Sequence, residues 1–505
     1  MEPDYDDAEE FSLQRWAIIG LSVVGFTLYL TVAAFSTVIF PGALIIFLAP
    51  LGLMILASAP EGRATSKKII LPLLFAGAIL LPMWPVYIHL KLGPVPIITP
   101  PRLILYALSM IWIFDMMYSP LRRGHFIMGL RRGGMISFFV LAFFALSALS
   151  APFAEGRSMA MQEFFRQLII WLLPFCIAVT YIRRPRDFRM LLTLLAIGAI
   201  ANGGIAIMEK ATGQLLASIL SPFITGSAEW LQIAQSQKIR DGVFRAQGTH
   251  THPLSVGEFI ALMAPFAIIF FLQTKNIFMR CFWAGGLFCL LAGALATSSR
   301  GALLAIFISL LTVLIMLLRE FLKNTVDSPF KPVAGLFMLA LVVVAPLGAI
   351  GAKKIISGDG GDSAARSSQA RLDQIDLAWP KIMKRPVIGY GSGRAARILG
   401  YWGRSLTIDN YYLTLALDLG LPGPLVFAGL MMTLARLSLK RSRAGPPGER
   451  LLYIAFFAAI ISLATTRTIV SMAGNLSFIY IMIGAFVGAG VAYPRTQKPR
   501  IKDEW

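Results

Sequence analysis

The sequence is poor in charged residues. Only 14% of its 505 residues are Asp, Glu, Lys or Arg, whereas 57% are hydrophobic, and the mean hydropathy is +0.71. Soluble domains carry about a quarter charged residues, so this composition excludes a soluble protein. Apolar stretches of about 20 residues recur from Trp16 to Tyr493, each long enough to cross a bilayer core of roughly 30 Å. The chain is therefore predicted to be a polytopic membrane domain.

Cysteine and metal-binding motifs are also scarce. Cys176, Cys281 and Cys289 lie in apolar stretches without CxxC spacing, which supports neither a disulfide framework nor a zinc site. The predicted loops lack HExxH, DxD and clustered carboxylates, so we expect no metal and no other cofactor. A basic n-region is missing too, because the chain starts MEPDYDDAEEF. The first apolar stretch is expected to remain as a helix rather than to be cleaved as a signal peptide.

The apolar stretches predict an all-α, polytopic transmembrane helical bundle of about fourteen helices. The predicted helices cover residues 17–36, 38–57, 69–90, 102–120, 135–152, 164–182, 188–209, 253–273, 277–297, 300–318, 332–352, 410–434, 451–466 and 474–492. Lys and Arg in short loops are retained on the cytoplasmic side, and here they cluster in alternate loops. Both termini are therefore predicted to be cytoplasmic. The net charge of +20 follows largely from this topology and gives no reason to expect a nucleic-acid partner.

Basic residues also concentrate in two segments that this topology places outside, 210–252 and 353–409. An anionic ligand would explain them; the alternative is that long loops cross the membrane regardless of charge and contact lipid phosphates. Within the long extracytoplasmic loop 353–409, helical spacing of Leu372, Ile375, Trp379 and Ile382 predicts a short amphipathic helix on the outer membrane face. The alternative is a helix packed on the outer helix ends without lipid contact, and Pro380 is expected to kink it.

In two segments, an arginine stands close to the predicted start of a helix. In the first, 244–253, Pro253 suits the first position of a helix whose free NH groups attract anions, and Arg245 would supply a forked phosphate donor. His250 and His252 are read either as site residues or as capping and loop hydrogen-bonding groups. In the second, Thr297-Ser298-Ser299-Arg300-Gly301, Ser299 can cap the next helix, and Arg300 either binds an anion or reaches lipid headgroups.

Two further segments follow. Gly389-Tyr390-Gly391-Ser392-Gly393-Arg394 permits a backbone nest for phosphate, but no GK[ST] follows, which excludes a P-loop. Asp409 and Asn410 open the predicted helix 410–434, where Asp409 is either a cap or a base. The charges predicted within spans lie in the outer leaflet, which suits a cavity open to the outside better than a transporter with midplane carboxylates. These charged residues are Arg166, Glu209, Glu258, Asp418 and Arg467.

Taken in order, these segments resemble the O-antigen ligase and polymerase family of polytopic bacterial membrane enzymes. The likeness covers roughly residues 160–490: a loop running into a His-Pro helix start, the T-S-S-R-G turn, Arg371 leading to R-P-V-I-G-Y-G-S-G, and N-x9-G-x-x-G from Asn410 to Gly423. The family's last motif usually has His before the Asn, where this chain has Asp409.

The resemblance implies inverting, metal-independent glycosyl transfer from undecaprenyl diphosphate at the outer face of the bacterial inner membrane. It makes Asp409 the expected general base. Five arginines are expected to bind the diphosphate: Arg245, Arg300, Arg166, Arg394 and Arg467. The other candidates for the site are His252, Glu258, Asn410 and Asp418. Implied partners are a lipid-linked glycan donor, a glycan or lipid-linked acceptor, membrane lipids, a flippase and a chain-length regulator.

The expected organisation has four parts: a cytoplasmic acidic tail (1–16), N-terminal transmembrane helices (17–160), a catalytic membrane region (161–492) and a cytoplasmic basic tail (493–505). The leading hypothesis is a polymerase that joins repeat units into O-antigen or exopolysaccharide. The alternative is a ligase that moves finished glycan to lipid A-core or to a protein. A lipid-linked glycan transporter would also need an external cationic surface, but it should tolerate loss of Asp409 and Arg300.

Overall fold

The computed structural model describes residues 65–85, 87–90, 98–223, 235–240, 242–324, 362–401, 408–445 and 447–490. The predicted tails and the predicted helices 17–36, 38–57 and 332–352 lie outside these residues. The chain divides into two units, and the second, Ala64–Asp115 with Leu121–Trp505, contains every contact discussed below.

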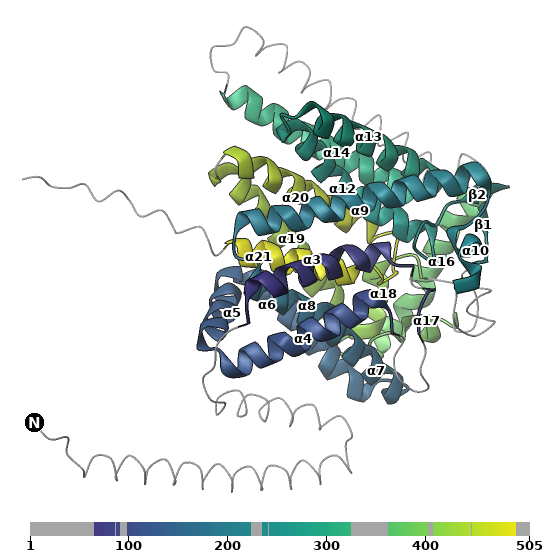
Figure 1. Ribbon diagram of the computed structural model, residues 1–505. Coiled ribbons are helices and arrows are strands. Elements are labelled where there is room, and N and C mark those ends of the chain that lie inside the picture. The colour runs from purple at the N-terminus through teal and green to yellow at the C-terminus, as the bar shows by residue number, and fades with distance from the viewer. Residues whose placement is uncertain are drawn as a thin grey trace, which may run out of the picture. The chain divides into compact units, whose positions relative to one another are not determined.

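The described part is mostly helical (Figure 1). The α-helices are α3 (Lys67–Met83), α4 (Pro100–Tyr118), α5 (Pro120–Gly133), α6 (Met135–Ser150), α7 (Arg157–Gln167), α8 (Leu173–Tyr181), α9 (Pro185–Thr212), α10 (Leu216–Ile219), α12 (Pro253–Gln273), α13 (Ile277–Ala296), α14 (Arg300–Asn324), α16 (Asp362–Lys384), α17 (Ala395–Ile398), α18 (Tyr411–Leu419), α19 (Pro422–Ala444), α20 (Pro447–Thr466) and α21 (Leu476–Ala489). Short 3-10 turns form η1 (Ala151–Phe153) and η3 (Ser221–Phe223), and a π-helical turn, η2 (Leu168–Leu172), joins α7 to α8.

Among the described residues, eight helices are long and apolar enough to cross a membrane, or nine if the bent pair α4 and α5 counts as one span. This confirms a polytopic helical bundle. The predicted helix 410–434 is wrong as a single element, because Gly420 adopts φ +73° and Pro422 starts a new helix, α19. A small antiparallel hairpin of β1 (Lys238–Arg240) and β2 (Val243–Arg245) also departs from the all-α prediction.

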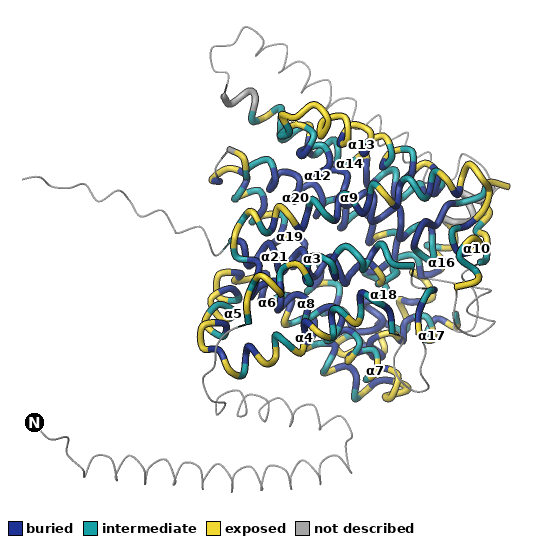
Figure 2. Tube along the Cα trace, in the orientation of Figure 1, coloured by how far each residue is buried: buried dark blue, intermediate teal, exposed yellow. Residues whose placement is uncertain are grey.

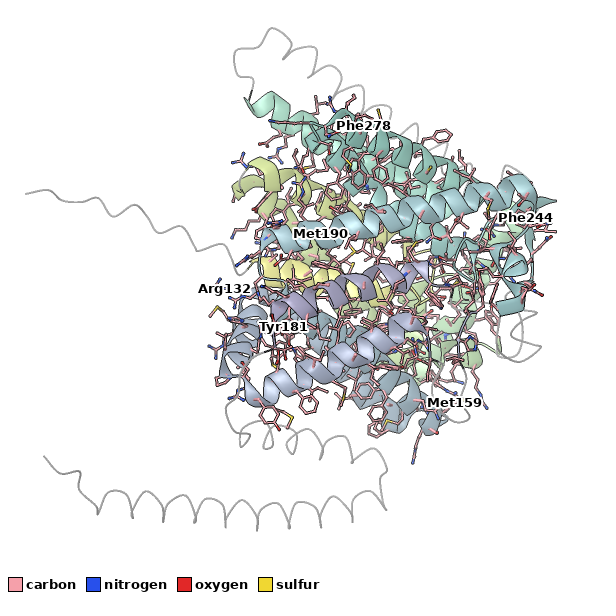
Figure 3. The ribbon with its side chains drawn as sticks, viewed as in Figure 1. Arg132, Met159, Tyr181, Met190, Phe244 and Phe278 are labelled. Carbon is pink, nitrogen blue, oxygen red and sulfur yellow. The ribbon has the colours of Figure 1, made fainter. Side chains whose placement is uncertain are left out.

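Close helix packing depends on small residues. A Cβ on Gly203 of α9 would lie 2.5 Å from the carbonyl oxygen of Cys289 in α13, and one on Gly484 of α21 would lie 2.4 Å from that of Phe175 in α8. Glycine lets helix backbones approach where lipid supplies no hydrophobic drive for association. Figure 2 shows α12 as one of the most deeply buried helices, whereas α13 carries many residues coloured as exposed. Phe278 of α13 is 82% exposed and lies at the edge of the bundle (Figure 3).

The predicted amphipathic helix is part of α16, which continues past Pro380 to Lys384. Ala378 and Ile382 are buried in a small cluster with Leu399 and Leu417. The predicted apolar residues Leu372, Ile375 and Trp379 are 56%, 42% and 55% exposed. One face of α16 therefore packs on the protein, and the other presents apolar side chains outward. Figure 1 shows α16 with α10, β1 and β2 gathered at one end of the bundle.

Candidate active site

Buried polar side chains of α9 hold the loop between β2 and α12 in place. The Glu209 carboxylate accepts hydrogen bonds from the backbone N–H groups of Gln247 (2.6 Å), Gly248 (2.8 Å) and Leu216 (2.7 Å). About two helical turns earlier in α9, the Asn202 side-chain oxygen accepts from the backbone N–H of Thr249 at 3.1 Å. Glu209 is fully buried, so this acid shapes the loop and does not face a substrate.

The loop brings the first two sequence segments together. The Arg245 Nε donates to the carbonyl oxygen of Thr297 at 3.0 Å, and the Ala246 N–H donates to that of Ala296 at 3.1 Å. Ser299 caps α14, because its Oγ accepts from the Ala302 N–H at 3.2 Å. Arg300, the first residue of α14, is half-buried. Arg245 and the turn that carries Arg300 are therefore parts of one surface.

The two histidines have the capping and loop roles that were the alternative in the sequence. His252 is the N-cap of α12, and its Nδ1 accepts from the Leu254 N–H at 3.2 Å. Burial lowers its pKa to about 4, with help from the positive charges of Arg245 and Lys238. His250 places Nε2 3.1 Å from Oδ1 of Asn475, and burial lowers its pKa to about 4. Both imidazoles are accordingly neutral at neutral pH.

Glu258 and Arg467 form a buried ion pair in which Glu258 Oε2 and an Arg467 terminal nitrogen are 2.9 Å apart. The same carboxylate oxygen accepts from the Asn475 side chain at 2.9 Å, and the other guanidinium end donates to the carbonyl of Met472 at 2.7 Å. Arg467 is 0% exposed and lies 5.0 Å from the ring centre of Tyr411. The pair therefore connects α12, which carries Glu258, with the loop after α20, which carries Arg467, and with the start of α18 at Tyr411.

The glycine-rich segment forms a nest, but a carboxylate of the protein occupies it. The Asp418 carboxylate accepts hydrogen bonds from the backbone N–H groups of Gly393 (2.8 Å), Arg394 (2.9 Å) and Ala395 (2.7 Å). Gly391 needs its left-handed φ of +101° and its missing Cβ, which would lie 2.3 Å from the Cβ of Ala154. Asp418 therefore holds the backbone of the glycine-rich segment in this conformation.

Arg394 follows the nest and is buried. Its backbone N–H bonds Asp418, and a terminal guanidinium nitrogen lies 3.1 Å from the sulfur of Met159. The guanidinium also packs against Gly156, where a Cβ would lie 2.8 Å from it. Arg394 thus joins the nest to the start of α7.

Asp409 precedes α18 but does not cap it. Asn410 is the cap, and its side-chain oxygen accepts from the Leu413 N–H at 3.2 Å. The Asp409 N–H donates to the Gln374 side-chain oxygen at 3.0 Å, and its carboxylate lies 3.9 Å from the Arg371 guanidinium, with 30% and 28% of the two side chains exposed. The Asp409 carboxylate is thus accessible and faces a cation.

The contacts of Arg371 and Gln374 with Asp409 were not predicted from the sequence, which pointed to Arg371 only as part of a family motif. Both reach Asp409, and their spacing of three residues puts them on one helix face. That spacing is visible in the sequence, but the pairing of α16 with residue 409 is a tertiary contact. These two residues join the candidate site.

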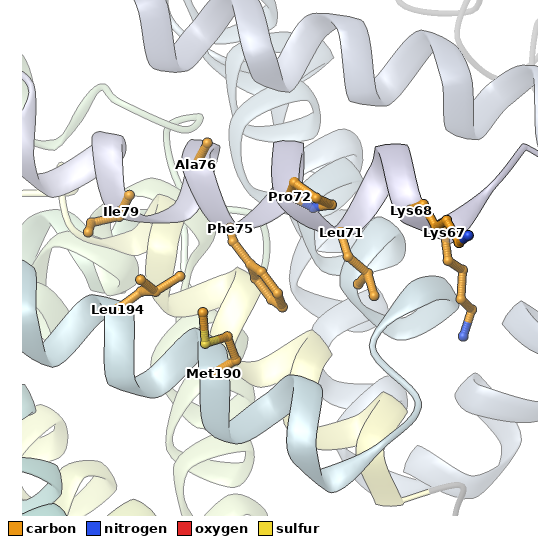
Figure 4. Close-up of a pocket in the computed structure, with 9 residues that line it drawn as sticks. All are labelled: Lys67, Lys68, Leu71, Pro72, Phe75, Ala76, Ile79, Met190 and Leu194. Carbon is orange, nitrogen blue, oxygen red and sulfur yellow. The ribbon is translucent and has the colours of Figure 1, made fainter.

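A cavity of about 430 Å³ adjoins the site. Arg166 lines it together with Arg102 and His250, and the Nε and one terminal nitrogen of Arg166 donate to the Glu163 carboxylate. A second cavity, of about 650 Å³, lies between α3 and α9 (Figure 4). Its nine lining residues are apolar except Lys67 and Lys68, so it offers no acid or base of the required type.

In the part of the chain that the structure describes, no group of three His, Cys, Asp or Glu side chains could hold a metal ion. The candidate residues supply guanidinium groups, the partly exposed carboxylate of Asp409 and two neutral imidazoles. That set can neutralise a polyanion and accept a proton.

Comparison with known proteins finds one similar family. Residues 285–428 match the family model described as O-antigen ligase, a segment that includes Arg300, Arg394 and Asp409. No curated protein sequence matches the chain. The family match confirms the resemblance expected from the motifs: residues 285–428 of this membrane protein are similar to the O-antigen ligase family.

Proposed function

We propose that the protein joins oligosaccharide repeat units carried on undecaprenyl diphosphate into a longer polysaccharide, by inverting transfer without a metal. The observation that carries the proposal is the partial exposure of the Asp409 carboxylate, which does not cap α18. Asn410 performs the capping, so the carboxylate of Asp409 remains partly exposed beside Arg371. An accessible carboxylate in this position can accept the proton of an acceptor hydroxyl.

In the proposed reaction, the acceptor hydroxyl oxygen attacks the anomeric carbon of the donor sugar from the face opposite the diphosphate. Asp409 takes the hydroxyl proton as the new C–O bond forms. The bond between the anomeric carbon and the diphosphate oxygen breaks, and its electron pair leaves with the diphosphate. Arg245 and Arg300 would neutralise that developing charge, because guanidinium forks match phosphate oxygens.

The remaining predicted residues receive supporting roles in this proposal. Arg467 is a positioning residue, since one of its terminal nitrogens donates to Glu258 and the other to the carbonyl of Met472. Asp418 holds the nest and Arg394 packs behind it. Glu258 and His252 are engaged in the ion pair and the helix cap. This division leaves Asp409, Arg245 and Arg300 to contact the reacting groups.

Transfer by the full-length protein in lipid vesicles tests the cation role. Replacing Arg300 with Gln should slow transfer about 10²–10³-fold, by analogy with the loss of an oxyanion donor. Arg300→Lys should restore only part of the rate, because Lys is a point charge and lacks the fork. Arg443→Gln is the matched control, since Arg443 is an exposed residue at the end of α19. Wild-type transfer by Arg300→Gln at normal protein level would refute the role.

A ligase is the second candidate, because the matching family model is described as O-antigen ligase. The two functions differ in the acceptor, a lipid-linked repeat unit or a finished lipid A-core. The glycan profile of a deletion strain distinguishes them. Single repeat units displayed at the surface indicate a lost polymerase, whereas long chains retained on the lipid carrier indicate a lost ligase.

A further inference from the structure

The cavity of about 650 Å³ is a groove between α3 and α9 (Figure 4). Leu71 and Phe75 of α3 point toward α9, and Met190 of α9 points toward α3. Apart from two lysines, every residue that lines this α3–α9 groove is apolar. Its volume lies within the roughly 300–1,000 Å³ of ligand pockets. The groove therefore has room for an apolar chain.

The two helices touch at one end of the groove. A Cβ on Gly198 of α9 would lie 3.3 Å from Met83 and 3.4 Å from Ile79, both in α3. Toward the start of α3, Met190 lines the groove and is 48% exposed, and Pro72 opposite it is exposed as well. The groove is therefore closed at the Ile79 end and reaches the surface at the lysine end.

The length of the groove matches one leaflet of a bilayer. Lys68 and Ile79 line it 11 residues apart on α3, which corresponds to about 16 Å of helix. Half of a hydrocarbon core of roughly 30 Å has nearly the same depth, and α9 is long and apolar enough to cross a membrane. One acyl chain would therefore extend from the lysines to Ile79.

The open end of the groove carries positive charge. Neither Lys67 nor Lys68 forms an ion pair with any residue that the structure describes. The hydroxyl of Ser66 caps α3 by accepting from the Lys68 N–H at 3.3 Å, and the first turn of α3 contains no acid. Because a helix start carries a partial positive charge, the lysines and the helix attract an anion to the same place.

Neighbouring side chains leave this end of the groove positive. Arg183 and Arg184, which precede α9, act on Lys67 with like charge. Asp187, in the first turn of α9, is the acid that acts on Lys67 with opposite charge. Arg122 also acts with like charge, but it has an ion-pair partner of its own. Like charges gathered in one place repel one another, and an anion among them relieves the repulsion.

We propose that the α3–α9 groove binds an anionic phospholipid of the cytoplasmic leaflet, with its phosphate at Lys67 and Lys68 and one acyl chain along the groove. The loop that carries these lysines is predicted to be cytoplasmic, and basic residues attract the anionic lipids of that leaflet. The predicted helices 17–36 and 38–57 are alternative occupants, but residues 11–60 contain no Asp or Glu that would pair with the lysines. An undecaprenyl chain is much longer than the groove.

Photocrosslinking of the full-length protein in nanodiscs tests the proposal. Phosphatidylglycerol and phosphatidylcholine probes with the same diazirine-bearing acyl chain are compared, and the labelled residues are identified by mass spectrometry. Phosphatidylglycerol should label residues 67–79 and 190–194, and phosphatidylcholine should label them about tenfold less. The Lys67→Gln, Lys68→Gln double variant should reduce labelling by phosphatidylglycerol to the phosphatidylcholine level. The Lys67→Arg, Lys68→Arg variant keeps both charges and should retain the preference, which guards against a folding defect.

Lys275→Gln is the matched control, because Lys275 is an exposed lysine in a loop predicted to lie on the same side of the membrane. It should keep the wild-type preference. Ala76→Phe leaves both lysines in place but narrows the groove that Ala76 lines, so it should abolish labelling of the groove by both probes.

Equal labelling of the groove by the two probes would overturn the proposal, as would undiminished labelling by phosphatidylglycerol when both lysines are Gln. Absence of crosslinks from the groove would also overturn it, because another part of the chain would then fill the groove. Displacement of the phosphatidylglycerol probe by an equal concentration of undecaprenyl phosphate would overturn it as well, since the groove would then bind a polyprenyl chain.

Discussion

At the scale of single residues, neighbouring side chains divide roles that the sequence alone leaves open. Asn410 caps α18, and Asp409 beside it contacts Arg371. Asp409→Asn retains the shape of the side chain but cannot take a proton. We expect normal thermal stability and a transfer rate reduced roughly 10²–10⁴-fold, with measurable activity in Asp409→His. Full activity of Asp409→Asn in the vesicle assay would move the base to another residue.

Asn410→Ala tests the capping role of the neighbouring residue. Loss of the cap should cost about 1 kcal/mol of stability, measured as a lower midpoint of thermal unfolding in detergent. The carboxylate of Asp409 remains in this variant, so transfer at low temperature should fall far less than in Asp409→Asn. An equal loss of transfer in both variants at matched stability would contradict the division of roles.

His252 predicts a dependence of stability on pH. Its pKa is lowered in the folded protein from 6.5 to about 4, so the unfolded chain binds the proton first as the pH falls. The stability that His252 contributes is present above pH 6.5 and is lost as the pH falls toward 4. Thermal unfolding between pH 7.5 and about 4 should show a midpoint that falls less in His252→Asn, which also caps helices. The same dependence of the midpoint on pH in the wild type and in His252→Asn would contradict the lowered pKa of His252.

At the scale of elements, glycine contacts set the distance between helices. A Cβ on Gly203 would press on the Cys289 carbonyl at 2.5 Å, whereas one on the adjacent Gly204 meets nothing within 4 Å. Gly203→Ala should therefore destabilise the protein by about 1–3 kcal/mol through overpacking. Gly204→Ala, which makes the same chemical change in α9, should leave stability unchanged or raise it by up to about 1 kcal/mol. Thermal unfolding of the pair measures the difference, and equal midpoints would rule out close contact.

At the scale of the whole described unit, the loops that join the helices form two groups, and contacts are found between loops of the same group. The loops predicted to be outside contact one another through Arg245 with Thr297 and Tyr411 with Arg467. The loops predicted to be inside contact one another through Gln273 with Gly448 and Arg450 with Glu320. Figure 3 shows Phe244, the neighbour of Arg245, at one end of the bundle and Arg132 at the other.

Cysteine labelling in intact cells tests which end is outside. In a variant whose three native cysteines are alanine, an impermeant thiol reagent should label Ser158→Cys and should leave Ala444→Cys unlabelled until the membrane is opened. Both positions are exposed, whereas Ser442 of the same basic segment is buried and would not report. Labelling of Ala444→Cys in intact cells would reverse the predicted orientation.

The membrane class, the family and the local helix signals could be predicted from the sequence, because they depend on composition and on neighbours along the chain. The length of the apolar stretches identifies spans, Pro253 and Ser299 mark helix starts, and the order of motifs identifies the family that residues 285–428 match. These features need no knowledge of which segments touch.

The roles of polar side chains in the site were decided only by tertiary contacts. In the sequence, Asp418 is separated from Gly393 by 25 residues and Glu258 from Arg467 by 209. Folding brings the Asp418 carboxylate onto three N–H groups and seals Glu258 against Arg467. A buried carboxylate needs hydrogen-bond donors or a counter-charge, and distant segments supply both. Burial by those segments therefore decides that Asp418 and Glu258 stabilise the fold, whereas the carboxylate of Asp409 stays partly exposed beside Arg371.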